Sequence, residues 1–432
     1  MGTTTREQVL LGIGKAGLPM GSLAYVQQGR REPCVFAYDE VWLVHPARFN
    51  VSADLQLMPG HQPHKAASPL DSVFPGAIAD TAPDAWGRCL IARDHAKRRR
   101  ADPRLAALTE LDYLLAVDDF SRVGALRVGD GEGGWQASLA GGRRRTPPLI
   151  ELARIYQASR AVERRQESAE DLRYLQGKGT SLGGMRPKCT IVDEDGLLAI
   201  GKFPSVSDTR SVTGGEVLAL RLAAQAGIEV APARIVLLGD TGHEVPVAVI
   251  HRFDRDRDDA RIPYQSAASL LQASRDEDRS YTEIIDAIRA HGHAPTTDAR
   301  ALWRRLVFNL LITNVGDHLR NHGFLHVGRG LWRLAPAFDI NSFPDKDRES
   351  KTWLSERDGP ITDVAMLLAR ASYFALDEQQ ALTVLCEVYS AVSNWRQVAL
   401  GPEVGLRAVE LDDFVPAFEH EQMNAAAVLL GR

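Results

Sequence analysis

The chain has 432 residues, of which 44% are hydrophobic and 25% charged, which is a globular composition long enough for two or three domains. Its formal net charge of −5 excludes general binding to nucleic acid or to anionic membranes through bulk charge. Because no apolar run reaches membrane-spanning length and the N-terminus lacks a secretory signal pattern, we expect a cytoplasmic protein without membrane contact. The four cysteines (Cys34, Cys89, Cys189 and Cys386) show no zinc-binding spacing, as expected in a reducing compartment.

The first 130 or so residues predict a small mixed α/β domain. Short apolar runs typical of strands, such as SLAYVQQ (22–28) and CVFAYDEVWLV (34–44), alternate with turns rich in proline and glycine. The segment DAWGRCLIARDHAKRRR (84–100) predicts a helix. The stretch at 129–148 is rich in Gly, Arg and Pro and indicates a boundary, so we expect a first domain over residues 1–145.

Residues 146–260 predict a helix followed by a hairpin, a second helix and a second hairpin. The helix LIELARIYQASRAVERR (149–165) comes first, and apolar runs then flank the turns at 193–196 and 239–242. Between these hairpins, TGGEVLALRLAAQAG (213–227) predicts a helix with a capping box of Thr213 and Glu216 and a stop at Gly227.

Residues 261–432 are predicted to be helical. The main helical segments are ALWRRLVFNLLITNV (301–315), EQQALTVLCEVYSAVSNW (378–395) and NAAAVLLG (424–431). A β-rich section therefore precedes an α-rich section, which indicates an α+β fold.

The first candidates for chemistry lie in the β-rich section. GKGTSLGGMRPK (177–188) contains the small residues Ser181, Gly183 and Gly184, which would let backbone N–H groups approach phosphate oxygens. Such glycine clusters are also found in ordinary turns. Lys202 ends a predicted strand, where ATP-dependent kinases place a phosphate-binding cation, or it is an exposed strand lysine. Glu216 is either the partner of that lysine or a helix cap.

The second group lies in the α-rich section. After the helix at 301–315, the segment DHLRN (317–321) supplies Asp317 and Asn321, which suit a base or orienting group and a Mg²⁺ ligand. Asp339 follows a predicted strand ending at Phe338 and offers a second metal ligand, or it caps a turn. The order of these candidates along the chain is that of a kinase. His318 and His322 have a metal-binding spacing but no third ligand nearby in sequence, which favours structural roles, with His318 buried and hydrogen-bonded.

Taken together, the motifs resemble the HipA family of bacterial serine/threonine protein kinases, the toxin halves of HipA/HipB toxin–antitoxin pairs. The resemblance runs through most of the chain, in YDEVWLVHPARFNVSADLQL, DYLLAVDDFSRVGALRV, SLGGMRPK, AIGKFPS, VIHRFDR, NVGDHLRNHGFL and LAPAFDIN. It implies a protein-kinase-like bilobal fold with a β-rich N-lobe (146–260), a helical C-lobe (261–432) and an appended N-terminal domain (1–145). Mg²⁺ and ATP would bind between the lobes.

The resemblance also implies residue roles. Ser181 matches the loop serine that the family autophosphorylates, and Lys202 matches the lysine that contacts ATP. His251 and Phe253 match the segment that meets adenine, although relatives often carry Glu in place of this histidine. The two magnesium ligands match Asn321 and Asp339.

One departure from the family concerns the catalytic loop. The family carries an aspartate five residues before the metal-binding asparagine, and here that position is Gly316. Asp317, the next residue, is therefore our expected base for a Ser or Thr hydroxyl. The rival hypotheses are a catalytically weak pseudokinase that acts as an antitoxin-bound corepressor, and a kinase for a small molecule.

The resemblance finally implies partners. A small HipB-like helix-turn-helix antitoxin would dock on the N-terminal domain, and operator DNA would be contacted mainly through that antitoxin. The protein substrate stays unknown, because substrate choice depends on surface shape.

Overall fold

The computed structural model describes residues 4–29, 31–131, 133–136, 151–175, 186–240 and 244–432. Its contacts divide the chain into two compact units. Unit 1 comprises Met1–Val206, Asp254–Asp276 and Gly328–Gly330, and unit 2 comprises Ser207–Phe253, Glu277–Val327 and Leu331–Arg432. The chain therefore crosses between the units several times, and one crossing falls at the Phe253–Asp254 peptide. The three-domain division predicted from the sequence stays a prediction.

Unit 1 contains an antiparallel five-stranded sheet with the strand order β4-β3-β2-β1-β5. Its strands are β1 (Thr4–Ile13), β2 (Leu18–Gln28), β3 (Cys34–Tyr38), β4 (His61–His64) and β5 (Leu126–Val128). In β1, Val9, Leu11 and Ile13 are buried whereas Leu10 is exposed. This alternation has the period of two expected for a sheet with one buried face.

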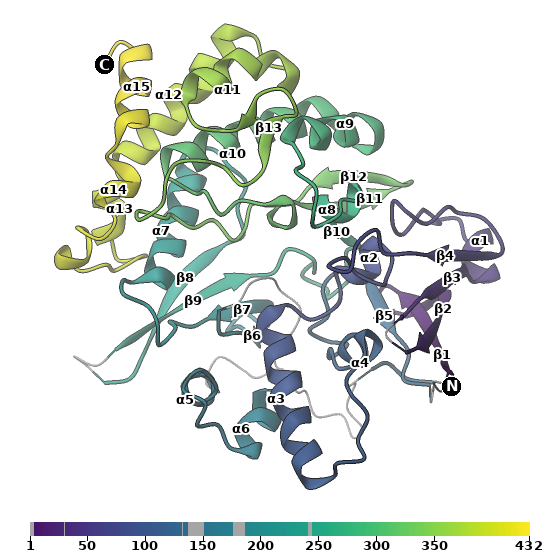
Figure 1. Ribbon diagram of the computed structural model, residues 1–432. Coiled ribbons are helices and arrows are strands. Elements are labelled where there is room, and N and C mark those ends of the chain that lie inside the picture. Colours follow the sequence, from purple (N-terminus) through teal and green to yellow (C-terminus); the bar gives the residue numbers. More distant parts are fainter. Residues whose placement is uncertain (1–3, 30, 132, 137–150, 176–185, 241–243) are drawn as a thin grey trace. The chain divides into compact units, whose positions relative to one another are not determined.

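Unit 1 also carries helices and a second hairpin. Its helices are α1 (Glu40–Val44), α2 (Gly76–Ala79), α3 (Ala85–Ala101), α4 (Glu110–Leu115), α5 (Leu152–Glu163), α6 (Ala169–Leu175) and α8 (Ala267–Leu270). The hairpin strands β6 (Lys188–Val192) and β7 (Leu198–Lys202) are antiparallel, and β10 spans Tyr264–Ser266. Helix α6 contacts both α3 and α5 (Figure 1). The helices predicted at 84–100 and 149–165 and the turn at 193–196 are confirmed.

One predicted strand is partly wrong. Of the run CVFAYDEVWLV, only Cys34–Tyr38 forms a strand, and Glu40–Val44 forms α1. The Asp39 side chain accepts a hydrogen bond of 2.8 Å from the Val41 N–H, which caps the new helix. A capping aspartate between two apolar runs therefore outweighs the strand propensity of Val41 and Trp42.

Unit 2 is mainly helical. Its helices are α7 (Val212–Gln225), α9 (Tyr281–His291), α10 (Pro295–Leu311), α11 (Val364–Arg370), α12 (Glu378–Ser393), α13 (Trp395–Leu400), α14 (Val415–Phe418) and α15 (Glu421–Leu429), with the 3₁₀ turns η2 (Leu319–Asn321), η3 (Ala371–Phe374) and η4 (Ala408–Glu410). Its strands are β8 (Ala233–Leu238), β9 (Val245–His251), β11 (Gly323–Gly328), β12 (Leu331–Leu334), β13 (Trp353–Ser355) and β14 (Gly359–Pro360). Among the described residues, every helix falls short of the length or apolar character that a bilayer-spanning segment requires.

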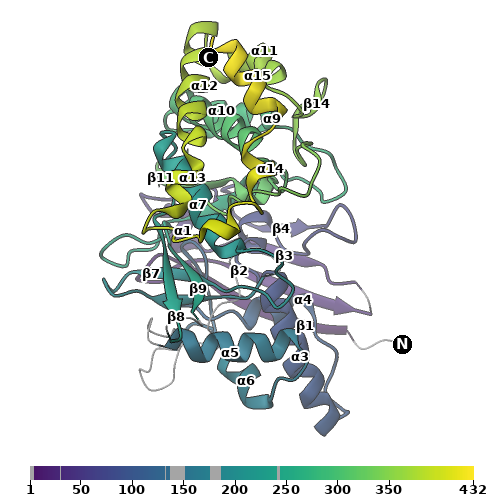
Figure 2. The ribbon, with the colours of Figure 1, turned by 90° about the vertical axis from the view of Figure 1, so that its left-hand side faces the viewer.

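Helix α10 is the core element of unit 2. It contacts α9, α11, α12 and α15 and lies among them (Figure 2). Leu302, Trp303 and Phe308 on this helix are fully buried, and the Trp303 indole donates a hydrogen bond of 3.1 Å to the Leu367 carbonyl. Because the site described below begins at the C-terminal end of α10, the packing of this helix fixes where the site starts.

Helix α7 begins earlier than predicted. Its N-cap is Ser211, so the capping box predicted for Thr213 and Glu216 is wrong. The Thr213 hydroxyl instead donates to the Pro246 carbonyl at 3.0 Å, which ties α7 to β9. A Cβ at Gly215 would lie 2.7 Å from the Phe414 ring, so this glycine permits close packing within unit 2.

We predict that Leu302→Ala lowers the free energy of unfolding of unit 2 by about 2–5 kcal/mol, because it opens a cavity beside α10. Urea denaturation followed by helical circular dichroism measures this change. The matched control is Leu400→Ala, since Leu400 is half exposed and its truncation should change stability by less than about 0.5 kcal/mol. Equal losses in the two variants would contradict the central role of α10.

Candidate active site

Thr313 holds the start of the segment that follows α10. Helix α10 ends at Leu311, four residues before the predicted end at Val315, and Thr313 has a left-handed backbone with φ of +56°. The Thr313 hydroxyl donates to the Ala417 carbonyl at 3.1 Å, and its own carbonyl accepts from the Phe343 N–H at 3.0 Å. A β-branched residue in this conformation is strained, so the surrounding contacts must hold it there.

The side chain of Asp317 is the anchor of residues 317–321, which we call the DHLRN loop. Asp317 is 3% exposed. Its Oδ2 accepts hydrogen bonds from the Tyr281 hydroxyl at 2.7 Å, the Asn309 amide at 3.0 Å and His322 Nε2 at 2.8 Å. Tyr281 begins α9, Asn309 lies on α10 and His322 directly follows the loop. The carboxylate therefore joins both ends of the loop to two helices.

The charge state of this anchor follows from its contacts. Burial raises the pKa of Asp317, but the charge and hydrogen bond of His322 and the Tyr281 hydroxyl outweigh it and bring the pKa below its ordinary value. Burial and the nearby Asp317 carboxylate also raise the pKa of Tyr281 well above its ordinary value. Tyr281 is thus a donor and Asp317 an ionised acceptor at neutral pH, which suits a permanent structural contact.

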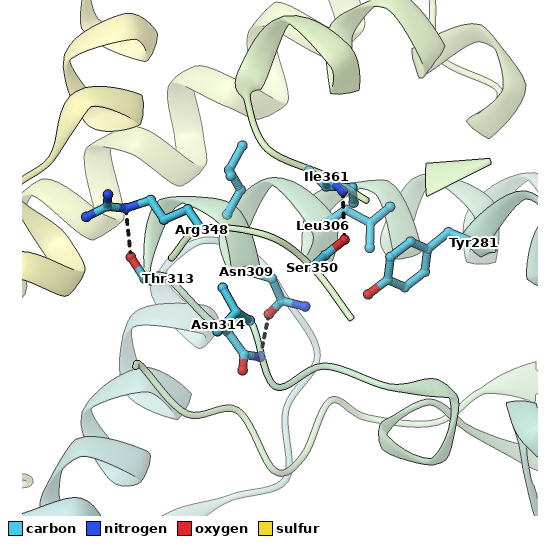
Figure 3. Close-up of a pocket in the computed structure, with 10 residues that line it drawn as sticks. Tyr281, Leu306, Asn309, Thr313, Asn314, Arg348, Ser350 and Ile361 are labelled. Carbon is cyan, nitrogen blue, oxygen red and sulfur yellow. Dashed lines mark hydrogen bonds between the residues drawn. The ribbon is translucent and has the colours of Figure 1, made fainter. Parts of the chain in front are cut away.

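The polar network continues away from the loop. The Asn314 amide donates to Asn309 Oδ1 at 3.0 Å, and Figure 3 shows the Asn309 amide and the Tyr281 hydroxyl directed toward one another. These side chains line a cavity of about 20 Å³, large enough for one water molecule. Arg348 and Ser350 line the same cavity (Figure 3). Arg348 Nε donates to the Thr313 hydroxyl, and the Ser350 hydroxyl accepts from the Ile361 N–H, so the segment after Asp339 also packs here.

Asp339 also has a left-handed backbone, with φ of +55°. The strand predicted to end at Phe338 ends at Leu334, but Ala337 still forms a parallel bridge with Val230. The Ala337 N–H donates to the Glu229 carbonyl at 2.7 Å, and the Ala337 carbonyl accepts from Ala231 at 3.1 Å. Asp339 is therefore held in an unusual conformation two residues beyond a fixed strand contact, as is common at functional sites.

The DHLRN loop and the Asp339 segment meet in unit 2. Asp317, Asn321, Phe338 and Ile340 line one cavity of about 10 Å³. The charge of Asp339 acts on His318, whose pKa is nevertheless lowered, because burial outweighs the nearby carboxylates. Amide and carboxylate oxygens are ligands that Mg²⁺ prefers, so Asn321 and Asp339 fit a magnesium ion.

The two histidines of this region have different surroundings. His322 is 2% exposed and bonds Asp317, and its ring meets that of Tyr281 edge-on. His318 is half-buried, and its Nδ1 atom is buried without a hydrogen-bond partner among the described residues. His318 is therefore less buried than predicted, and His322 is the fully buried histidine, bonded to Asp317.

The segment predicted to meet adenine lies beside Asp339. His251 ends β9, and its N–H donates to the Pro232 carbonyl at 2.8 Å. The Phe253 ring packs against Phe338, with ring centroids 5.4 Å apart. Unit 2 therefore brings Phe253 to the residue that precedes Asp339. Glu216, on α7 of the same unit, is 4% exposed.

Lys202 lies in unit 1, at the end of β7 as predicted. Its cross-strand neighbour in β6 is Lys188, whose ammonium pairs with Asp84 at 2.9 Å while Asp84 caps α3. The Asp84 carboxylate thus balances one of two adjacent lysines. The pairing of Lys202 with Glu216 stays a prediction. The phosphate-loop residues Ser181, Gly183 and Gly184 lie outside the described residues.

A comparison with known families gives the relationship. The HipA-like C-terminal domain matches residues 180–395, which is half of the chain. The chain belongs to the HipA family. A Haemophilus influenzae protein named "Putative kinase" is 26% identical over 182 residues, which cover 38% of this chain and 53% of that protein. "Putative kinase Y4mE" of Sinorhizobium fredii is 27% identical over 192 residues, which cover 39% of this chain and 44% of that protein. The chain thus spans about half the length of each of these relatives.

A solved structure confirms the fold. A chain of the Shewanella oneidensis HipA, HipB and operator DNA complex superposes with a TM-score of 0.65 at 15% sequence identity, covering 98% of this chain and 97% of that chain. The predicted α+β, protein-kinase-like HipA fold class is therefore confirmed.

Sequence reasoning missed the residues that hold the HipA-family loop. Tyr281 and Asn309 lie 36 and 8 residues before Asp317, on separate helices, and carry no motif. Lys188 is the last residue of the glycine-rich segment at 177–188, but its pairing with Asp84 depends on a contact across about a hundred residues of chain. Asn309 alone could have been recognised from the sequence, because it is a polar residue that interrupts the apolar run near the C-terminal end of α10.

We predict that Asp317→Ala destabilises unit 2 by at least about 3 kcal/mol, because two buried donors, Tyr281 and His322, and the part-buried Asn309 amide lose their acceptor. Asp317→Asn keeps one acceptor oxygen and should cost less. Urea denaturation measures both variants against Asp347→Ala, an exposed aspartate further along unit 2. An Asp317→Ala variant as stable as the Asp347→Ala control would refute the anchoring role.

Proposed function

We propose that this HipA-family protein is an ATP-dependent serine/threonine protein kinase that transfers the γ-phosphate of ATP to a protein hydroxyl. The observation that carries the proposal is the meeting of Asn321 with the Phe338–Ile340 segment at one cavity, with Asp339 held in a left-handed conformation. Family membership and relatives that bear kinase names support the same reaction class.

Each functional residue has a distinct task in this proposal. Asn321 and Asp339 hold Mg²⁺, which neutralises charge on the phosphates when bound. Lys202 contacts the α- and β-phosphates, and Glu216 orients it. His251 and Phe253 meet adenine. The backbone at Ser181, Gly183 and Gly184 approaches the terminal phosphates, and Ser181 is also the autophosphorylated hydroxyl.

Asp317 has two tasks open to it. As a base it would accept the proton of the attacking hydroxyl. Its Oδ2 already accepts three hydrogen bonds and its side chain is buried, so the present contacts favour holding Asn321 in place. A base role requires the other carboxylate oxygen or a rearranged loop. Phosphoryl transfer depends mainly on positioning and electrostatics, so an anchoring aspartate still contributes to the rate.

The partners and organisation follow from the family. We propose that residues 1–145, 146–260 and 261–432 act as an N-terminal domain, an N-lobe and a C-lobe. A HipB-like helix-turn-helix antitoxin docks on the first of these, and operator DNA is contacted mainly through the antitoxin. The solved HipA, HipB and operator DNA complex of Shewanella oneidensis supports this choice of partners. The protein acts in the cytoplasm on a protein substrate of unknown identity.

A second candidate function is a pseudokinase that serves as an antitoxin-bound corepressor. The observation that favours it is the surroundings of Gly316. A Cβ at this position would lie 2.7 and 2.8 Å from two atoms of the Phe343 ring. The ring thus occupies the space that a catalytic aspartate at residue 316 would need, and the protein would bind ATP but transfer phosphate slowly.

We predict that Asp339→Asn abolishes phosphate transfer and weakens Mg²⁺-dependent ATP binding at least about tenfold, because a neutral amide is a poorer magnesium ligand. Isothermal titration with ATP, with and without Mg²⁺, measures the binding. Asp347→Asn is the matched control and should bind as the wild type does. Unchanged ATP binding in the Asp339 variant would remove the metal assignment.

A double variant separates the two candidate functions. If the rate is limited by the missing carboxylate, Gly316→Asp combined with Phe343→Leu should raise phosphate transfer by about 10²-fold, the usual scale for general base catalysis. Gly316→Asp alone should lower the melting temperature, since the new side chain meets Phe343. Phosphorylation of a model protein measures the rates. If the double variant transfers phosphate at the wild-type rate, no carboxylate is missing, and Asp317 is sufficient for the catalytic role.

A further inference from the structure

The peptide between Phe253 and Asp254 joins the two units directly, because unit 2 ends at Phe253 and unit 1 resumes at Asp254. On the unit 1 side, Asp254 and Arg255 form a buried pair that we call the junction clamp. Asp254 is 2% exposed, and its Oδ2 accepts from the Gly124 N–H at 2.7 Å and from Arg255 Nη1 at 2.9 Å. Arg255 also donates to the Gly124 carbonyl at 2.9 Å and the Arg122 carbonyl at 2.8 Å.

The acceptors of the clamp belong to the core of unit 1. Arg122 is fully buried, and its guanidinium donates to the carbonyls of Leu114 and Val117 at 2.9 Å each. Burial lowers the pKa of Arg122 to about 10, so it remains a cation at neutral pH. Gly124 has a left-handed φ of +71°, and a Cβ there would approach Tyr264 to 3.2 Å. The clamp is therefore fixed to the end of α4 and to the start of β5.

On the unit 2 side, the same peptide leads straight to the candidate active site. Phe253 packs on Phe338, and Phe338 is bonded to Asp339, the proposed metal ligand. Ala337 on the other side of Phe338 is held to Glu229 and Ala231 by two backbone hydrogen bonds. A displacement of Phe253 therefore acts on Phe338 and on Asp339, which is bonded to it, because Ala337 on the other side is held in place.

We propose that Asp254 and Arg255 are positioning residues that set the Phe253–Phe338 contact and, through it, the conformation of Asp339. The inference rests on the proposed function, because it gives the nucleotide and metal site a mechanical link to unit 1. Phe253 and Asp254 are consecutive, so a single peptide unit separates the clamp from Phe253 and keeps their Cα atoms at a fixed spacing. A partner that shifts the α4–β5 region of unit 1 would thereby change ATP affinity.

A matched control exists within unit 1. Asp119 is 4% exposed, and it pairs with Arg127 at 2.6 Å and with Arg261 at 3.0 Å. It resembles Asp254 in burial and in holding arginine, and one of its arginines, Arg261, forms an antiparallel backbone bridge with Arg255. Asp119→Asn therefore removes a comparable buried charge near the clamp and leaves the hydrogen bonds of the Asp254 carboxylate in place.

The test uses the full chain with Asp254→Asn and Asp119→Asn. Hydrogen exchange without nucleotide, followed by mass spectrometry, should show faster exchange at residues 337–340 in the Asp254 variant only. Titration with ATP and Mg²⁺ should show affinity weakened about tenfold in the Asp254 variant and unchanged in the control. If Asp254→Asn does not fold, Arg255→Lys replaces it, because lysine keeps the charge and loses the fork that reaches Arg122.

The outcomes separate this inference from the proposed function. Equal exchange at residues 337–340 in the two variants overturns the inference, whether or not ATP binds. Faster exchange in the Asp254 variant with unchanged ATP affinity overturns the link to the nucleotide site. A wild type that binds no ATP refutes the proposed function, and the exchange comparison then still decides whether the clamp positions the Asp339 segment.

Discussion

One carboxylate oxygen, Asp317 Oδ2, accepts hydrogen bonds from Tyr281, Asn309 and His322. An ionised group is stable in a buried site only when its charge is balanced and its hydrogen bonds are made. Because the three donors come from α9, α10 and the residue after the DHLRN loop, satisfying the carboxylate also fixes the loop. The position of Asn321 then follows from the packing of two helices.

The segment that contains Asp339 is also held in place, and its neighbours Phe338 and Ile340 line a cavity together with Asn321. Asp339 keeps a left-handed backbone that costs free energy, and the Ala337 bridge and the Phe253–Phe338 contact hold the segment leading to it. Strain of this kind persists where the surrounding structure enforces it. The DHLRN loop and residues Phe338 and Ile340 thus line one cavity in unit 2. The junction clamp in unit 1 is covalently continuous with Phe253, which packs on Phe338.

The sequence predicted the elements whose signal is local. The apolar periodicity of α3, α5 and α12 and the turn at 193–196 depend on neighbouring residues, and all four were confirmed. It failed where one polar side chain changes the outcome, as Asp39 does by capping α1. It also could not show that Tyr281 anchors Asp317 or that Phe343 covers Gly316, because such contacts join residues far apart in the chain. The roles of Lys202, Asn321 and Asp339 stay predictions.

The most direct test of the account is whether the protein carries out phosphate transfer. The purified full chain is incubated with Mg²⁺ and ATP, and intact mass and peptide mapping then locate any covalent phosphate. The account predicts phosphate on Ser181, lost when Asn321 is replaced by alanine. ATP that binds in a Mg²⁺-dependent manner, with no phosphate on this chain or on any added protein, would contradict the kinase and leave the corepressor.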